Sequence, residues 1–215
     1  MRLFLASYRF GAHGDRLIEL VGTPGRIGVV AAAADAWPVA ARTAALTSDV
    51  ALLTEAGFDP VEIDLRAVTP TTAEAALAGL SAVWVRGGNT FVLRHRLATS
   101  GVDHVLRERL RRDDLVYAGY SAGACVMGPS LTGVDAADPP AELGEITDDP
   151  VPQDGLRVID DVLVPHWSTP TAPSALDPDG AARAMADACR AAGVRYRTLT
   201  DDQVFVRDGD DDRVL

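Results

Sequence analysis

Short apolar runs alternate with helical stretches over roughly the first 130 residues, and this alternation constrains the fold more than any other feature of the chain. Five runs read as buried strands, at residues 3–7, 27–32, 61–65, 82–85 and 115–118. The segments between them have the lengths of helices, so the pattern predicts an α/β fold: a mostly parallel sheet with helices on both faces. Such sheets place ligand sites at the carboxyl ends of their strands.

The second part of the chain differs from the first in composition and in hydrophobic periodicity. Residues 131–154 are rich in acids and prolines with little periodicity, and they predict a long loop, with a short hairpin as an option. Residues 158–165 then read as a strand and residues 180–192 as the last helix, followed by short closing strands. We see no linker or internal repeat, so the prediction is a single domain over residues 1–215.

Composition excludes several classes of function. The formal net charge of −11 argues against nucleic acid or an anionic membrane as a partner, because both need a basic surface. All 20 basic residues are arginines, which excludes catalytic lysines. The two cysteines, Cys125 and Cys189, make neither a disulfide framework nor a cysteine-rich metal site. No apolar run approaches the ~18 residues of a transmembrane helix, and the expected location is the cytoplasm.

Ser121 lies between Gly119 and Gly123, where the fifth apolar run meets a helical stretch. This is the Gly-x-Ser-x-Gly pattern of a nucleophile elbow, which needs small neighbours because the strand and the helix come close together. The N–H group of Ala122 falls at the start of the helix, where positive partial charge stabilises a developing oxyanion. The alternative is a glycine-rich turn that carries a serine by chance.

A serine nucleophile needs a base, and the base is expected to be a histidine. His95 and His104 fall in helical stretches among arginines, which is typical of a solvated surface, and His13 lies in an early loop. His166 follows the apolar run at 158–165, so it is placed at the ligand side of the sheet. It is the candidate base, and the alternative is a core histidine packed by Trp167.

The acid that orients this base is expected from the loop at residues 131–154. The residues alone leave four carboxylates open, which are Asp135, Asp138, Glu142 and Glu145.

A second glycine turn, Gly87-Gly88-Asn89-Thr90, follows the fourth apolar run and precedes a helix. Its backbone N–H groups are candidates for the second oxyanion donor, and the alternatives are a phosphate-binding or a purely structural turn. No Gly-x-Gly-x-x-Gly follows a strand, and no cluster of His, Cys, Asp or Glu has metal-ligand spacing. The expectation is therefore no cofactor and no metal.

Three motifs in this order resemble the peptidase E family: Arg-Gly-Gly-Asn-Thr-Phe at 86–91, Gly-Tyr-Ser-Ala-Gly-Ala at 119–124 and Val-Pro-His-Trp at 164–167. The runs at 7–11 and 199–203 are also similar to bacterial members. The resemblance implies a three-layer α/β sandwich of the class I glutamine amidotransferase-like (flavodoxin-like) type. It also implies hydrolysis of short peptides, typically dipeptides with an N-terminal aspartate.

By motif, the resemblance makes Ser121 the nucleophile, His166 the base, and the N–H groups of Gly88 and Ala122 the oxyanion hole. It makes Asp135 the nearest match to the orienting acid. Family members that favour aspartyl substrates carry an arginine in the loop after the histidine, and residues 168–180 contain none. Arg9 and Arg86 are the candidates to replace it.

The sequence thus predicts a serine dipeptidase that forms an acyl-enzyme on Ser121. Another amide hydrolase on the same scaffold and a non-catalytic module that binds a small ligand are the alternatives. The expected partner is a small peptide substrate, with no nucleic acid and no membrane, and a homodimer is left open.

Overall fold

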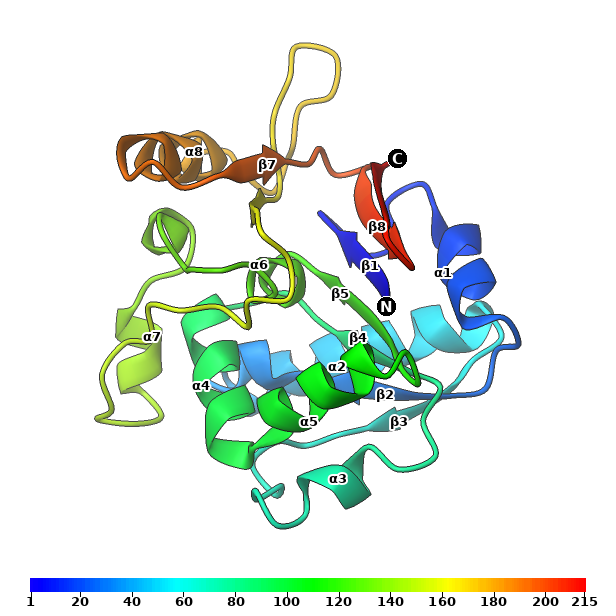
Figure 1. Ribbon diagram of the computed structural model, residues 1–215. Helices are drawn as coiled ribbons and strands as arrows, with labels where there is room; N and C mark the ends of the chain where they lie inside the picture. The colour runs from blue at the N-terminus through cyan, green and yellow to red at the C-terminus, as the bar shows by residue number, and fades with distance from the viewer.

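A seven-stranded sheet forms the middle layer of the molecule (Figure 1). The computed structural model describes all 215 residues. The strand order is β3-β2-β4-β5-β1-β8-β9, in which β3 to β1 run parallel while β8 and β9 each pair antiparallel to a neighbour. The strands of this sheet are β1 (Arg2–Ala6), β2 (Arg26–Val30), β3 (Asp59–Glu62), β4 (Ala82–Val85), β5 (Val116–Tyr120), β8 (Val204–Asp208) and β9 (Asp211–Val214).

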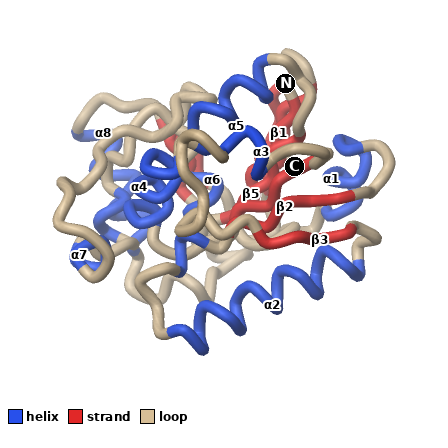
Figure 2. Tube along the Cα trace, turned by 90° about the horizontal axis from the view of Figure 1, so that it is seen from below, coloured by secondary structure: helices blue, strands red, loops and turns tan.

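Helices cover both faces of the sheet. Figure 2 shows α2 running along one side of β2 and β3, with α3 and α5 on the other side. The helices are α1 (Gly14–Val21), α2 (Val39–Glu55), α3 (Ala73–Ala76), α4 (Thr90–Ser100), α5 (Val102–Arg111), α6 (Ala122–Cys125), α7 (Ala141–Gly144) and α8 (Ala181–Ala191), with short 3₁₀ turns η1 (Ala32–Ala34) and η2 (Val134–Ala136). None of these helices combines the length and the apolar character that crossing a bilayer requires.

The alternation of side chains along each strand produces two cores. In β1, Leu3 and Leu5 belong to the core beneath α3, α4 and α5, whereas Phe4 and Ala6 belong to the core beneath α1 and α2. All four side chains are fully buried, as expected for a parallel strand that is covered on both faces. The predicted α/β fold, with a mostly parallel sheet between two helical layers, is confirmed.

The carboxyl ends of β4 and β5 meet at one edge of the sheet, because the two strands are parallel neighbours. The turn at Gly87-Gly88 follows β4, and Ser121 follows β5. The two glycine turns that the sequence singled out therefore lie at the same edge.

A small second sheet stands beside this edge. Strand β6 (Val162–Val164) pairs parallel with β7 (Tyr196–Thr198), and α8 packs against both. Figure 1 shows β7 and α8 together, away from the main sheet. A separate apolar cluster, which includes Val162, Val164 and Met185, fills the space between this layer and η2.

Two details of the predicted second part were wrong. The segment 131–154 contains η2 and α7 and no hairpin. The predicted strand at 158–165 is shorter, because its first residues bond to the chain that leaves α6. Val158 N and Ile159 N both donate to Met127 O, at 2.9 and 3.2 Å, so only Val162–Val164 forms a strand.

Candidate active site

Ser121 occupies a strained turn between β5 and α6. Its backbone has φ 51° and ψ −115°, a conformation that L-residues rarely adopt and that the surrounding structure must enforce. Gly123 explains why the turn needs small residues, since a Cβ atom there would lie 2.1 Å from the carbonyl oxygen of Val85. The turn presents the Ser121 hydroxyl to a cavity at the carboxyl edge of the sheet.

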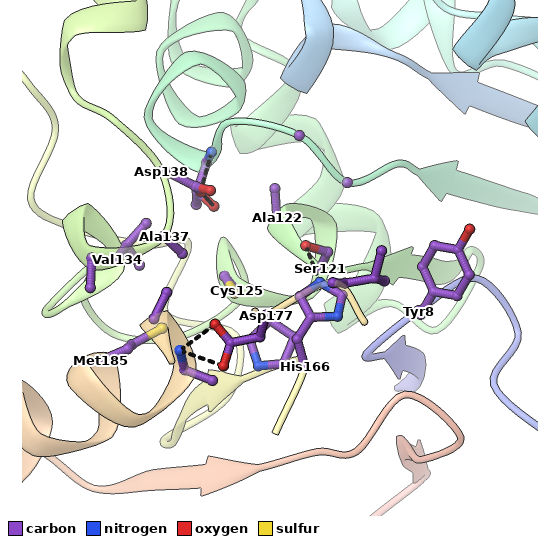
Figure 3. A pocket seen from close by; sticks show the side chains of 18 of the residues that line it. Tyr8, Ser121, Ala122, Cys125, Val134, Ala137, Asp138, His166, Asp177 and Met185 are labelled. Atoms are coloured by element: carbon purple, nitrogen blue, oxygen red, sulfur yellow. Dashed lines mark hydrogen bonds between the residues drawn. The ribbon is translucent and has the colours of Figure 1, made fainter. Parts of the chain in front are cut away.

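His166 faces this serine from the second sheet. The residue lies just past the end of β6, and its Nε2 is 3.1 Å from Ser121 Oγ (Figure 3). Its own backbone is strained, with φ 58°, and its N–H group donates to Ser7 Oγ at 2.7 Å. The structure thus brings together the two residues that the sequence predicted as nucleophile and base.

The carboxylate next to His166 belongs to Asp201. Its Oδ1 is 2.7 Å from His166 Nδ1, and the same oxygen accepts from the Ser7 hydroxyl at 3.2 Å. Its Oδ2 accepts from the Ser174 hydroxyl at 2.6 Å. An ionised carboxylate only accepts hydrogen bonds, so Nδ1 must carry the imidazole proton. This leaves Nε2 free to accept the proton of Ser121.

None of the four carboxylates predicted for this role contacts His166. Asp135 lies in η2 with an exposed side chain, so the prediction that it orients the base was wrong. Glu145 is also exposed, and Glu142 makes no hydrogen bond to the histidine. Asp138 points instead at the start of α4.

A sequence signal for Asp201 existed in the run Leu199-Thr-Asp-Asp-Gln203. Asp201 follows β7 as His166 follows β6, and the carboxyl ends of parallel strands meet. Nothing in the sequence shows that β6 and β7 pair with each other, however, so this signal could not be used.

Asp138 ties the loop at residues 131–140 to the first turn of α4. Its Oδ2 accepts from Thr90 N (2.8 Å) and from Thr90 Oγ1 (2.5 Å). Burial raises the pKa of Asp138 to about 6, against the lowering effect of the two Thr90 donors. The charges of Glu142 and His166 act on this pKa in opposite directions, upward and downward respectively.

The two predicted oxyanion donors both line the cavity. Gly88 has φ 144°, and a Cβ atom there would lie 2.5 Å from Ala33 O, so only glycine fits this turn. Asn89 then caps α4 by accepting from the backbone N–H groups of Phe91 and Val92. The N–H groups of Gly88 and Ala122 make no hydrogen bond within the protein and are available to a ligand.

The cavity in front of Ser121 has a volume of about 450 Å³. Its lining is half apolar, and Tyr8, Trp37 and Tyr120 contribute aromatic walls. Arg86 is the one arginine in the lining, whereas Arg9 does not reach it.

Arg86 lines the cavity and also forms a charge pair with the buried Asp49. Arg86 Nη2 donates to Tyr120 Oη at 3.2 Å, and its Nε lies 3.5 Å from Asp49 Oδ2. Burial raises the pKa of Asp49, while the charge of Arg86 opposes this shift. Elsewhere, no three side chains of the types His, Cys, Asp and Glu come together as a metal site.

Comparison with known proteins decides the family. The model of peptidase family S51 matches residues 38–208, which is most of the chain. The chain belongs to peptidase family S51. Its resemblance to peptidase E is thereby confirmed. Among curated relatives, an uncharacterized peptidase of Listeria innocua serovar 6a is 29% identical over 116 residues, covering 54% of this chain and 53% of the relative. An uncharacterized peptidase of Pasteurella multocida is 28% identical over 110 residues, covering 50% of this chain and 49% of the relative.

Solved structures share the fold. A putative peptidase E from Listeria monocytogenes EGD-e superposes with a TM-score of 0.79 at 20% identity, covering 100% of this chain and 97% of that one. A peptidase from an acI-B1 actinobacterium superposes with a TM-score of 0.69 at 15% identity, covering 100% and 86% of the two chains. The alignments to the two curated relatives span about half of each relative's length.

Proposed function

We propose that this S51 chain is a serine dipeptidase in which Ser121 is the nucleophile, His166 the base and Asp201 the orienting acid. The observation that carries the proposal is a pair of linked hydrogen bonds. One joins Ser121 Oγ and His166 Nε2 (3.1 Å), and the other joins His166 Nδ1 and Asp201 Oδ1 (2.7 Å). A strained serine at a strand-to-helix turn, with a base in reach and the base held by a carboxylate, is the arrangement that activates a hydroxyl nucleophile.

The first half-reaction transfers the acyl group to the serine. His166 Nε2 takes the proton of Ser121 as Oγ attacks the scissile carbonyl carbon, and the N–H groups of Ala122 and Gly88 stabilise the oxyanion. The carbonyl re-forms as the C–N bond breaks, and His166 returns its proton to the leaving amine. An ester on Ser121 and a free amine are the products of this half-reaction.

The second half-reaction hydrolyses that ester. A water molecule gives one proton to His166 as its oxygen attacks the ester carbon, and the same two N–H groups hold the new oxyanion. Ser121 Oγ then leaves and takes the proton back from His166, which restores the free enzyme. Asp201 keeps Nδ1 protonated throughout and stabilises the imidazolium that forms in each half-reaction.

The size and lining of the cavity favour a short peptide. Its volume of about 450 Å³ is within the usual range of small-ligand sites, ~300–1,000 Å³, and half of its lining is apolar. Arg86 is the cation of this lining that would meet an acidic substrate group, so aspartyl dipeptides belong in any substrate panel. A different amide bond is the alternative substrate class.

Hydrolysis of a dipeptide panel by wild type and by Ser121→Ala tests the proposal. We expect wild-type hydrolysis of at least one dipeptide and a loss in the variant on the order of 10⁶-fold, as in other serine triads. Thermal unfolding of both proteins checks that the variant is folded. Equal rates for the two proteins would contradict the proposal, and specific binding without turnover would favour the ligand-binding alternative.

A further inference from the structure

We propose that Ser174 is a positioning residue of the catalytic site: its hydroxyl fixes the carboxylate of Asp201, which in turn orients His166. The inference rests on the proposed function and deepens it, because it adds a fourth residue behind the nucleophile, the base and the acid. Ser174 acts through Asp201 and makes no hydrogen bond of its own with His166 or Ser121.

Ser174 is the one buried residue of the loop at residues 168–180. This loop lies between β6 and α8, and Figure 1 shows it projecting above β7. Ser174 is 9% exposed, whereas every other residue of the loop is exposed or half-buried. A polar side chain that is buried needs a hydrogen-bonding partner inside the protein. The partner of the Ser174 hydroxyl is the carboxylate of Asp201.

The contacts around Ser174 fix the direction in which its hydroxyl donates. Its Oγ accepts from Leu176 N at 3.1 Å and donates to Asp201 Oδ2 at 2.6 Å. A hydroxyl has a single proton and an ionised carboxylate only accepts, so the bond to Asp201 cannot run the other way. Ser174 is therefore a preorganised donor to a charged group, and such hydrogen bonds are stronger than those between neutral groups.

The second oxygen of Asp201 depends on Ser174 alone. Oδ1 meets His166 Nδ1 and the Ser7 hydroxyl, whereas Oδ2 accepts only from Ser174. No arginine lies within ion-pair distance of Asp201, although the chain carries 20 arginines. The torsion that turns an aspartate carboxylate has a broad energy minimum, so its orientation must come from its partners. Donors on both oxygens fix the plane in which Oδ1 meets the imidazole.

The same loop also forms part of the cavity wall, through residues 176–179. A substitution that merely displaced the loop would change this wall and weaken substrate binding, which raises KM. Loss of the hydrogen bond from Ser174 to Asp201 acts instead on the pair of residues that takes up the proton in the transition state, which lowers kcat. Separate measurement of kcat and KM therefore distinguishes a positioning role from a purely structural one.

The kinetic test compares Ser174→Ala with Thr169→Val on the best dipeptide of the panel. Thr169 is the matched control, because its hydroxyl also accepts a backbone N–H group of this loop, from Ala172 at 2.9 Å, but makes no hydrogen bond to Asp201. Ser174→Ala should lower kcat by about tenfold, as expected for one hydrogen bond to a charged group, and change KM by less than about threefold. Thr169→Val should leave both constants within about threefold of wild type. Equal losses in the two variants, or a loss in Ser174→Ala that lies in KM alone, would overturn the inference.

Proton NMR separates this inference from the proposed catalysis, because it needs no substrate. The proton on His166 Nδ1, identified by its loss in His166→Ala, should exchange with water about tenfold faster in Ser174→Ala than in wild type, because its acceptor is held less firmly. In Thr169→Val this proton should exchange at the wild-type rate. An unchanged rate in Ser174→Ala, shown to be folded by thermal unfolding, would overturn the inference. Faster exchange in a protein that hydrolyses no dipeptide would support it and would count against the dipeptidase proposal alone.

Discussion

Replacing Asp201 by asparagine removes the charge behind His166 and leaves the shape of the side chain almost unchanged. Asp201 accepts three hydrogen bonds, from His166 and Ser7 on Oδ1 and from Ser174 on Oδ2. An asparagine offers one acceptor oxygen and one donor group, so at least one of these donors loses its acceptor in either orientation of the amide. The size of the effect depends on which side the amide oxygen takes.

If the amide oxygen faces His166, the tautomer of the imidazole is kept and only the charge is lost. A hydrogen bond to a charged group contributes ~1.5–3 kcal/mol, so kcat should fall by roughly 10- to 150-fold. If the NH₂ group faces His166, Nδ1 must become the acceptor and Nε2 carries the proton, so it cannot accept from Ser121. The same substitution in a serine protease triad lowers kcat by about 10⁴-fold, which sets the upper bound.

The assay is the steady-state hydrolysis of the best dipeptide of the panel, with Asp135→Asn as the matched control. Both variants remove one aspartate charge, but the Asp135 side chain is exposed and takes no part in the hydrogen bonds of His166. We expect a loss between roughly 10- and 10⁴-fold for Asp201→Asn and a change of less than about threefold for Asp135→Asn. The opposite order would refute the assignment of Asp201, provided that both variants unfold at temperatures close to that of the wild type.

Two further predictions follow from contacts around the site. Ser7→Ala should lower kcat by about tenfold and the free energy of unfolding by about 1–2 kcal/mol, measured by kinetics and urea unfolding, because the buried hydroxyl bridges His166 N and Asp201. Arg86→Met should cost about 3 kcal/mol in urea unfolding, because Asp49 is left buried without its cation, and adding Asp49→Asn should recover most of this loss.

Local patterns in the sequence singled out Ser121 and His166, which the structure brings to hydrogen-bond distance of each other. Gly119 meets atoms of its own strand-to-helix turn and Gly123 meets Val85 of the neighbouring strand, but both glycines lie within two residues of Ser121, so a short window of sequence carries the signal. His166 was found in the same way, from an apolar run and the residue that ends it. The alternation of strands and helices likewise predicted the parallel sheet and its two helical layers.

The contact between Asp201 and His166 depends on strand pairing over a long range, which no local sequence pattern reveals. Asp201 reaches His166 because β6 and β7 are parallel neighbours in a sheet of their own, although more than 30 residues separate the two strands in the chain. The resemblance to peptidase E pointed to Asp135 by its distance from the serine along the chain. The backbone of residues 131–140 instead turns Asp138 toward α4 and leaves Asp135 in solvent.

The most direct test of the catalytic role of Ser121 is covalent labelling with a fluorophosphonate probe, read out by mass spectrometry of the intact protein and of its peptides. An activated serine attacks the phosphorus of the probe, whereas an ordinary surface serine does not react. We expect one adduct on wild-type protein, located on Ser121, and none on Ser121→Ala. Labelling should slow by orders of magnitude in His166→Ala, which keeps the serine but removes its base. A folded wild-type sample that takes up no probe, or an adduct at another residue, would contradict the account.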